Sequence, residues 1–332
     1  MNALAAKVEK VPAATEKALT ARWVDIDEAH AGQRLDNFLL GLLKGAPKSL
    51  IYRVVRSGEV RVNGARATAD QRLLDGDRVR IPPVRLADSG SSGPRVRAPA
   101  VEFPVLFEDA HLLVIDKPSG VAVHGGSGVS SGVIEQLRAS RPSERMLELV
   151  HRIDRETSGA LIIARRRQSL TALHDAMRHG QVGKRYLAWV WGAWDGPERL
   201  VRLPLLRYLT PEGERRVRVS EEGQFAGTRL KCLARGRYPG LGDVSLMQAD
   251  LETGRTHQIR VHLAHLGHPL VGDEKYGRFE SNKILDKTEL SRMFLHAFRI
   301  TFDHPAGGGR QRIEAPLPQA FRAFAEVCHA PF

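Results

Sequence analysis

Residues 151–159 are His-Arg-Ile-Asp-Arg-Glu-Thr-Ser-Gly, a polar turn that leads directly into the apolar run Ala-Leu-Ile-Ile-Ala at residues 160–164. The apolar run predicts a buried strand. One carboxylate, Asp154, stands among arginines in the turn, which is also typical of an exposed loop with weak surface ion pairs. Three features favour a functional carboxylate: the loop enters a buried strand, Gly159 permits a tight turn or a close approach, and neighbouring cations would keep the acid ionised. Both interpretations stay open on these residues alone.

The same nine residues resemble the signature of the RluA-type pseudouridine synthases, which is written H-R-L-D-x-x-T-S-G. The stretch matches at every defined position except one, where the similar residue Ile153 replaces the leucine. The resemblance implies that Asp154 is the nucleophile of the reaction. It also implies that Arg152 enters the space that a flipped-out target nucleotide leaves in the RNA.

Upstream of this signature, residues 105–109 and 112–115 predict two strands joined by a short turn. They are followed by Asp-Lys-Pro-Ser-Gly-Val at residues 116–121, which resembles the family's first motif, a strand and then D/N-K-P-x-G. Lys117 can also be a lysine at a strand end whose ammonium group reaches solvent. Its position favours a structural role near the site over a chemical one, and we count it among the candidate substrate-binding residues.

Downstream, residues 184–192 alternate as a strand with Tyr186, Ala188 and Val190 on one face. Taken alone, Tyr186 is best explained as a core aromatic residue whose hydroxyl group has a partner. The first five residues of this strand, however, resemble the family's K-x-Y-x-A motif. The resemblance implies that Tyr186 lies against the target base.

A further long match lies at residues 253–262, Thr-Gly-Arg-Thr-His-Gln-Ile-Arg-Val-His, which resembles the family's motif T-G-R-x-H-Q-I/L-R-x-H. The resemblance implies that Arg260 pairs with the catalytic carboxylate. Ile259 is expected to supply an apolar wall of the pocket, and His257 is a further candidate substrate-binding residue.

Several histidines in and after this motif would suit a zinc site, namely His257, His262, His265 and His268. No cysteine or H-E-x-x-H arrangement accompanies them. Neutral histidines that cap strands or contact RNA explain them with fewer assumptions. The sequence therefore predicts no metal site.

Residues 33–81 predict a compact unit of two helices, a hairpin and a last alternating strand. The first helix has apolar residues at helical spacing between Leu35 and Leu42, and the second extends from about residue 48 to Gly58. Asn63-Gly64 is a strong hairpin signal. This order of elements resembles an S4 RNA-binding domain.

The unit holds ten Lys or Arg residues against five Asp or Glu residues. Five of the basic residues are expected to share a face with the helix ends and to contact phosphates: Lys48, Arg53, Arg56, Arg61 and Arg66. Such contacts position RNA without selecting its sequence. Any one of these residues, taken singly, is also explained by a solvated charged surface.

The remaining segments complete the domain plan. Residues 1–20 predict a mobile tail rich in Ala and Lys, and residues 82–100 predict a flexible linker by their Pro, Ser and Gly content. Residues 101–325 predict one α+β domain, in which residues 278–292 are a polar excursion before the closing strands. The resemblance implies a small S4-type domain followed by a catalytic domain on a mixed, mainly antiparallel sheet.

The charge of the chain points to an anionic partner. The 332 residues carry a formal net charge of +12 and give a pI of about 10.1, so nucleic acid is the first candidate. A membrane surface is the second, but no basic amphipathic helix is evident, and the longest uncharged apolar run, residues 186–194, is too short to span a bilayer. Cys232 and Cys328 form no motif and the N-terminus has no signal-type apolar core, so we expect a cytoplasmic location.

The implied reaction is the isomerisation of uridine to pseudouridine in RNA, which requires no cofactor. Residues 204–207 and 216–220 most resemble the C-type branch, which modifies large-subunit (23S) ribosomal RNA, and a monomer is expected. A D-type large-subunit enzyme or a transfer RNA enzyme is the alternative within the family. Outside it, the chain could be a non-catalytic RNA-binding ribosome assembly factor, or a glycosidase for which Glu156 is the only nearby second acid.

Overall fold

The computed structural model of the protein describes residues 20–27, 30–43, 46–84, 98–126 and 130–331. The predicted mobile tail lies outside the described residues except at its last position, and most of the predicted linker lies outside them too. The chain divides into two compact units between residues 94 and 95, and each unit is described separately.

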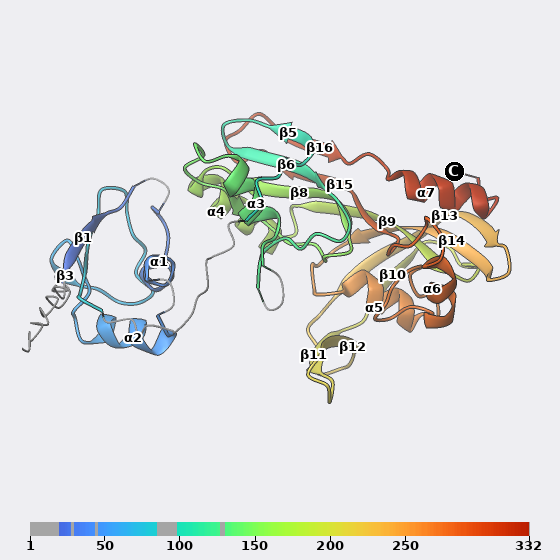
Figure 1. The fold of residues 1–332 in the computed structure, drawn as a ribbon, viewed down its shortest axis with the longest axis horizontal. Coiled ribbons are helices and arrows are strands. Elements are labelled where there is room, and N and C mark those ends of the chain that lie inside the picture. Colours follow the sequence, from blue (N-terminus) through green and yellow to red (C-terminus); the bar gives the residue numbers. More distant parts are fainter. Residues whose placement is uncertain (1–19, 28–29, 44–45, 85–97, 127–129, 332) are drawn as a thin grey trace, which may run out of the picture. The chain divides into compact units, whose positions relative to one another are not determined.

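The first unit is a four-stranded antiparallel sheet with two helices (Figure 1). Its elements are β1 (Arg22–Asp25), α1 (Leu35–Leu42), α2 (Lys48–Arg56), β2 (Arg61–Val62), β3 (Ala65–Arg66) and β4 (Arg78–Ile81). The strands lie in the order β1-β4-β2-β3. Both predicted helices and the hairpin are confirmed, and Asn63 and Gly64 have the positive φ angles, 51° and 80°, that a tight hairpin turn requires.

This unit begins earlier than residue 33, where the sequence placed its start. Strand β1 pairs with β4, with Arg22 opposite Ile81, and Ile26 just after it belongs to the apolar core of the unit. Most of the β1 side chains are exposed. The strand was missed because its residues show no apolar alternation, and only its pairing with β4 defines it.

The second unit is built on a ten-stranded sheet. Its elements are β5 (Val105–Glu108), β6 (Leu112–Lys117), α3 (Val133–Ser140), β7 (Glu148–Leu149), β8 (Ser158–Ala164), α4 (Arg167–Arg178), β9 (Gly183–Trp191), β10 (Arg199–Arg202), β11 (Leu205–Leu209), β12 (Arg215–Val219), β13 (Gly227–Tyr238), β14 (Gly242–Leu251), α5 (Gln258–His265), α6 (Phe279–Leu285), β15 (Leu295–Asp303), β16 (Arg310–Glu314) and α7 (Gln319–Val327).

The main path of the sheet is β10-β13-β14-β9-β15-β8-β6-β5, with β16 beside β15 and β7 beside β8. Among the described strands, β15 and β8 are paired in parallel, and every other pair is antiparallel. The expected mixed, mainly antiparallel sheet is therefore confirmed.

Strand β9 lies in the middle of the sheet and packs on both faces. Tyr186, Ala188 and Val190 lie in one apolar cluster together with side chains of α3 and α5. Trp189 and Trp191 point to the other face, where they join a cluster that includes side chains of α7. The alternation predicted for this strand is confirmed, but both of its faces are buried because helices cover the sheet on each side.

Helices α5, α6 and α7 lie where the sequence predicted none. The polar excursion at residues 278–292 contains α6, and α7 closes the chain beyond the last strand. Helix α7 ends at Val327, two residues past the expected end of the domain. Strands β11 and β12 pair only with each other and form a separate two-stranded sheet (Figure 1), which we call the arm (residues 205–219).

Candidate active site

Asp154 lies in the loop between β7 and β8, and its side chain is 25% exposed. The backbone of the loop is closed by a hydrogen bond from the Thr157 N–H to the Asp154 carbonyl oxygen, at 3.1 Å. The Asp154 Oδ2 atom accepts a hydrogen bond from Arg260 Nη1 at 3.0 Å. The cation that contacts the carboxylate is therefore 106 residues away in sequence.

The expectation that the flanking arginines hold this acid is wrong for Arg155. Its Nε donates to the Gly120 carbonyl oxygen at 2.9 Å and lies 3.4 Å from a carboxylate oxygen of Glu156. Arg152 is exposed and lines the space next to Asp154. Arg155 lies in the hydrogen-bonded turn of residues 154–157, which directs its side chain to Gly120 and away from Asp154.

Arg260 is fixed from behind by a second carboxylate. Its Nε and Nη2 atoms donate to the two carboxylate oxygens of Asp273 at 2.7 and 2.8 Å, a bidentate pair that sets the plane of the guanidinium group. Burial alone would lower the pKa of Arg260, but the charges and hydrogen bonds of Asp273 and Asp154 outweigh it and raise the pKa. The sequence analysis assigned no role to Asp273.

Gly159 explains how the Asp154 loop meets the sheet. It begins β8 next to β15 with φ of +110°, and a Cβ atom there would stand 2.4 Å from the Ala297 carbonyl oxygen. On the other side it pairs with Lys117 of β6. The close approach predicted for this glycine is confirmed, because any side chain would separate the two parallel strands.

Lys117 is wholly buried and is not a substrate contact. Its ammonium group donates to three carbonyl oxygens, those of Pro118, Val121 and Arg155, at 2.7, 2.8 and 2.9 Å. Burial lowers the pKa of this lysine to about 7, against the opposing attraction of Glu156 and Asp154. The prediction that Lys117 binds substrate is therefore wrong. Its three hydrogen bonds agree with the structural role that was also predicted for it near the site.

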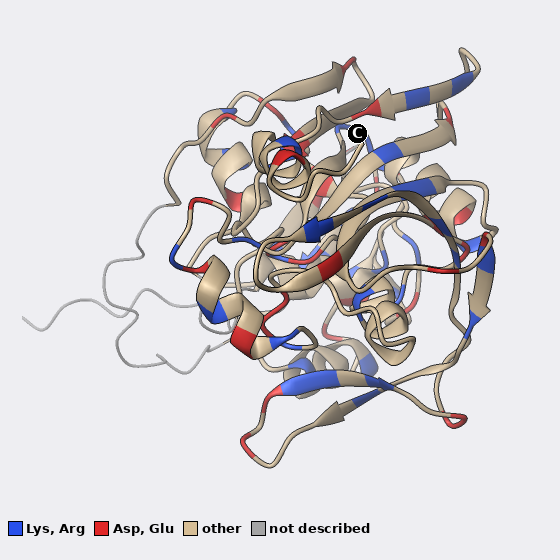
Figure 2. Ribbon diagram, turned by 90° about the vertical axis from the view of Figure 1, so that its right-hand side faces the viewer, with Lys and Arg blue, Asp and Glu red and all other residues tan. Residues whose placement is uncertain are grey.

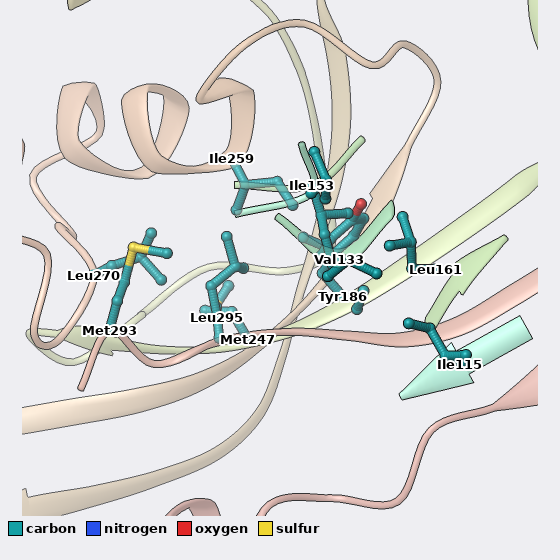
Figure 3. Packing of buried hydrophobic residues seen from close by; sticks show 14 of the residues in the cluster. Ile115, Val133, Ile153, Leu161, Tyr186, Met247, Ile259, Leu270, Met293 and Leu295 are labelled. Atoms are coloured by element: carbon teal, nitrogen blue, oxygen red, sulfur yellow. The ribbon is translucent and has the colours of Figure 1, made fainter. Parts of the chain in front are cut away.

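Tyr186 lies close to Ile153 and Ile259 in the apolar cluster (Figure 3). All three side chains also line a cavity of about 740 Å³ that contains Asp154. Burial, together with the nearby charge of Asp154, raises the pKa of Tyr186. The phenol therefore stays protonated, and Tyr186 supplies an aromatic ring to the wall of the cavity.

A second cavity, of about 520 Å³, lies on the other side of the Asp154 loop. The two cavities share five lining residues, which are Arg152, Ile153, Asp154, His257 and Arg260. The predicted site residues are thus brought together around Asp154, except for Lys117. Glu156 lines only the second cavity, and the acid that lines the first cavity besides Asp154 is Glu252, which pairs with Arg202 at 3.5 Å.

His257, His262, His265 and His268 lie on or beside α5. The prediction that these histidines cap strands is therefore wrong. His257 precedes the helix with a left-handed φ of 54°. His262 is buried between Thr228 Oγ1 and the Leu203 carbonyl oxygen, and His268 contacts the Trp191 carbonyl oxygen. No group of three or more potential metal ligands is found in the part of the chain that the structure describes.

In the first unit, Arg53, Arg56 and Arg66 line two shallow depressions on either side of Tyr52. Arg61 stands opposite Arg66 in the hairpin, and its Nη1 atom donates to the Gly64 carbonyl oxygen. Lys48 begins α2 and is exposed. Arg53, Arg56 and Arg66 thus lie together around α2 and the hairpin, beside an aromatic residue that was not predicted, while Lys48 and Arg61 line neither depression.

Tyr276 is the second site residue, besides Asp273, that the sequence analysis left without a role. Its hydroxyl group lies 2.9 Å from His257 Nδ1, and its ring lies 5.2 Å from the Arg260 guanidinium carbon. Both missed residues belong to the run Gly-Asp-Glu-Lys-Tyr-Gly at residues 272–277, which extends the family likeness. That likeness was the only signal, since the run has no periodicity that points to α5.

Comparison with known proteins agrees with this geometry. Residues 111–265 match the family described as RNA pseudouridylate synthase, and residues 33–79 match the S4 domain. None of the helices among the described residues is long and apolar enough to cross a membrane.

The chain is 49% identical over 302 residues to ribosomal large subunit pseudouridine synthase C of Yersinia pestis, covering 90% of this chain and 93% of that one. It is 48% identical over 304 residues to the protein of the same name in Escherichia coli K12, covering 90% and 94%. Among solved structures, human RNA pseudouridylate synthase domain containing 1 is 26% identical, with a TM-score of 0.56 over 68% of this chain and 86% of that chain. The chain therefore belongs to the RluA-type family of RNA pseudouridine synthases, which are isomerases, and it carries an S4 domain.

Proposed function

We propose that this enzyme converts specific uridines of large-subunit (23S) ribosomal RNA to pseudouridine, with Asp154 as the nucleophile. The observation that carries the proposal is a single carboxylate held by a buried arginine at the wall of a cavity that also contains a buried aromatic ring. The relatives named as ribosomal large subunit pseudouridine synthase C, which match along nearly the whole chain, support the choice of RNA.

The isomerisation breaks the N1–C1′ bond, turns the base, and forms a C5–C1′ bond. The proton on C5 is lost and N1 gains a proton, so atoms and charges balance without an external reactant. Asp154 can serve by attacking C1′ of the ribose, by attacking C6 of the base, or by assisting the formation of a glycal. Each of these routes needs an oriented carboxylate, and Arg260, itself fixed by Asp273, supplies the orientation.

The apolar side of the cavity suits a detached uracil. The Tyr186 ring would stack on the base, which is worth roughly 1–3 kcal/mol, and Ile259 would close the wall beside it. Because the pKa of Tyr186 is raised by burial, the phenolate that would act as a base is disfavoured. We therefore assign Tyr186 to stacking ahead of proton transfer.

The target uridine must leave its stack to reach Asp154, at a cost of a few kcal/mol. Arg152 is exposed beside the cavity and would enter the vacated space. Phosphate contacts of the basic surface would offset the cost. The arm supplies such a surface: it is the lowest hairpin in Figure 2 and carries Lys or Arg segments along its strands.

We assign the arginines of the first unit that surround Tyr52 to phosphate contacts as well. A single chain contributes all the residues of the proposed site, so we propose that the protein acts as a monomer.

The test is pseudouridine mapping of ribosomal RNA in cells that lack this protein, complemented with the wild type, Asp154→Ala or Asp195→Ala. Asp195 is an exposed acid in a surface ion pair and serves as the matched control. Specific large-subunit pseudouridines should vanish and return with the wild type and the control only. Unchanged ribosomal RNA would overturn the substrate assignment, and full rescue by Asp154→Ala would overturn the nucleophile.

A further inference from the structure

The arm is attached to the body of the enzyme through Tyr276. The backbone N–H of Val217, in the middle of β12, donates to the Tyr276 hydroxyl oxygen at 3.0 Å. Val217 and Leu205 form a small apolar cluster with Val261 of α5, and the Tyr276 ring packs against it. The root of the arm therefore rests on this tyrosine and on the helix that carries Arg260.

The opposite side of Tyr276 faces the candidate active site. Its hydroxyl group lies 2.9 Å from His257 Nδ1, and the two rings meet edge to face with centroids 5.5 Å apart. The guanidinium carbon of Arg260 lies 5.2 Å from the centre of the Tyr276 ring. One side chain thus contacts the arm, a histidine that lines both cavities, and the arginine that holds Asp154.

The hydrogen bonds favour one direction for each proton. The Tyr276 oxygen accepts from the Val217 N–H, so its own proton is free to point to His257 Nδ1. A neutral histidine that accepts at Nδ1 carries its proton on Nε2. Burial lowers the pKa of His257, although Asp154 opposes the shift, and this favours the neutral ring. His257 is then a hydrogen bond donor through Nε2.

The backbone beside Tyr276 strengthens the same connection. Asp273 Oδ1 accepts from the N–H groups of both Lys275 and Tyr276, at 2.8 and 3.0 Å, while it also holds Arg260. Lys275 in turn forms an ion pair with Glu214 of the arm, and Arg216 Nη1 donates to the Lys275 carbonyl oxygen at 3.2 Å. Residues 273–276 therefore touch Arg260 at one end and the arm at the other.

We propose that Tyr276 is a positioning residue that couples the arm to the active site. When the arm is seated, the Tyr276 hydroxyl group holds His257 as the Nε2–H tautomer. In this form His257 donates a hydrogen bond to the RNA bound beside Asp154. When the arm lifts, the Tyr276 oxygen loses the Val217 N–H, and the orientation of both the hydroxyl group and His257 is released. RNA that binds along the basic arm would thus complete the site as it docks. The donor role of His257 rests on the proposed function, whereas the coupling itself does not.

The first experiment reads the tautomer directly and needs no activity. Full-length protein labelled with ¹⁵N-histidine is compared by long-range ¹H–¹⁵N NMR as wild type, Tyr276→Phe and Val217→Pro, with His257→Asn used to assign the signal. Val217 donates outward from β12, so proline removes that donor while leaving the pairing with β11 intact. Tyr238→Phe is the matched control, since Tyr238 lies in the other apolar cluster.

The wild type should show His257 mainly as the Nε2–H form. Both Tyr276→Phe and Val217→Pro should shift it toward a mixture of tautomers, and Tyr238→Phe should not. A wild-type ring protonated on Nδ1, or a ring that Val217→Pro leaves unchanged, would overturn the coupling. If the wild type shows no activity on RNA while the tautomer behaves as expected, the proposed function fails and the coupling stands.

The second experiment separates chemistry from binding on a ribosomal RNA fragment. Tyr276→Phe should lower the single-turnover rate by about tenfold, as expected for one lost hydrogen bond, with RNA affinity unchanged within about twofold. His257→Asn keeps a side chain that tolerates the left-handed backbone but removes the Nε2 donor. It should give a similar loss, and the double variant should be no slower than either single variant. If the rate losses of the two single variants multiply in the double variant, or if Tyr276→Phe lowers only the RNA affinity, Tyr276 does not act through His257.

Discussion

Asp154 illustrates how one side chain acquires its function from residues that are remote in sequence. Its contact is Arg260, which is held by Asp273, and both of these residues are buried. The bidentate pair with Asp273 uses the Nε and Nη2 atoms of Arg260 and does not depend on Asp154. Removing Asp154 leaves Arg260 with its bidentate partner, so we expect Asp154→Ala to lose chemistry while the fold and the RNA affinity change little.

At Tyr186 the ring and the hydroxyl group can be tested apart. If stacking is the role, Tyr186→Phe should keep most of the activity. Tyr186→Leu should lose roughly 10- to 100-fold in single-turnover rate, the equivalent of one base–aromatic stack. Rates for both variants on the same RNA fragment decide between the roles. A Phe variant as slow as the Leu variant would instead assign the hydroxyl group to proton transfer.

His296 makes the stability of the catalytic unit depend on pH. It is completely buried, and Ser158 Oγ, which accepts a hydrogen bond from Arg292, lies 2.9 Å from its Nδ1 atom. Burial lowers the pKa of His296 from 6.5 to about 4, and the nearby Arg292 adds to the effect. Between these values the unfolded chain binds a proton that the folded chain does not. The stabilisation is therefore complete above pH 6.5 and is lost as the pH falls toward 4.

We expect protonation of His296 in the unfolded chain to lower the free energy of unfolding by up to roughly 3 kcal/mol between pH 7 and pH 4. Urea unfolding of the full chain, followed by tryptophan fluorescence at a series of pH values, measures it, since Trp189, Trp191 and Trp194 lie in this unit. His296→Gln should flatten the pH dependence over this range, whereas substitution of the exposed His265 should not. Equal slopes for both variants would show that other groups carry the effect.

At the scale of elements, the parallel contact of β8 with β15 leaves no room for a side chain at Gly159. A Cβ atom on Gly159 would lie 2.4 Å from the Ala297 carbonyl oxygen, at a φ of +110°. Gly242 has a similar positive φ of +104° but nothing within 4 Å of its would-be Cβ atom.

Comparing alanine at these two positions separates the clash from the backbone strain. Gly242→Ala should cost about 1–2 kcal/mol from the positive-φ backbone alone. Gly159→Ala should cost about 3 kcal/mol or more, because backbone atoms must move apart. Urea unfolding of both variants gives the difference. Equal costs would mean that β15 yields to the added methyl group without penalty.

At the scale of the whole molecule, we expect RNA binding and chemistry to be divided between the two units. The first unit carries an arginine-lined face around Tyr52, while all the proposed catalytic residues lie in the second. Removing residues 1–85 should therefore weaken RNA binding more than the rate of the bound complex. The slope of log affinity against log salt should also become shallower, by about one for each lost phosphate contact.

Binding measured at several salt concentrations, together with single-turnover rates at saturating RNA, tests this division. Full-length protein with Arg53, Arg56 and Arg66 changed to Gln is the control for any effect of truncation on folding. A truncated enzyme with unchanged affinity and a lost rate would place the first unit in the chemistry.

The sequence by itself determined the elements whose signals are local. Apolar periodicity gave α1, α2 and β9, the Asn63-Gly64 pair gave the hairpin, and the family motifs marked Asp154, Tyr186 and Arg260. Strand β1 and helix α6 were missed because their residues lack a clear apolar period, and pairing or packing elsewhere defines them.

Local sequence patterns did not show which charges meet, although the family resemblance had implied the pair of Arg260 with Asp154. The arginines next to Asp154 in sequence were expected to hold it, yet Arg155 turns to Gly120 and the contact comes from α5. Likewise Lys117 lies beneath the loop, and Tyr276 joins the arm to His257. The direction in which a side chain points depends on the local backbone and on which distant segments of the chain pack around it. Electrostatic interactions act over a few ångströms in space, so no local pattern records these partners.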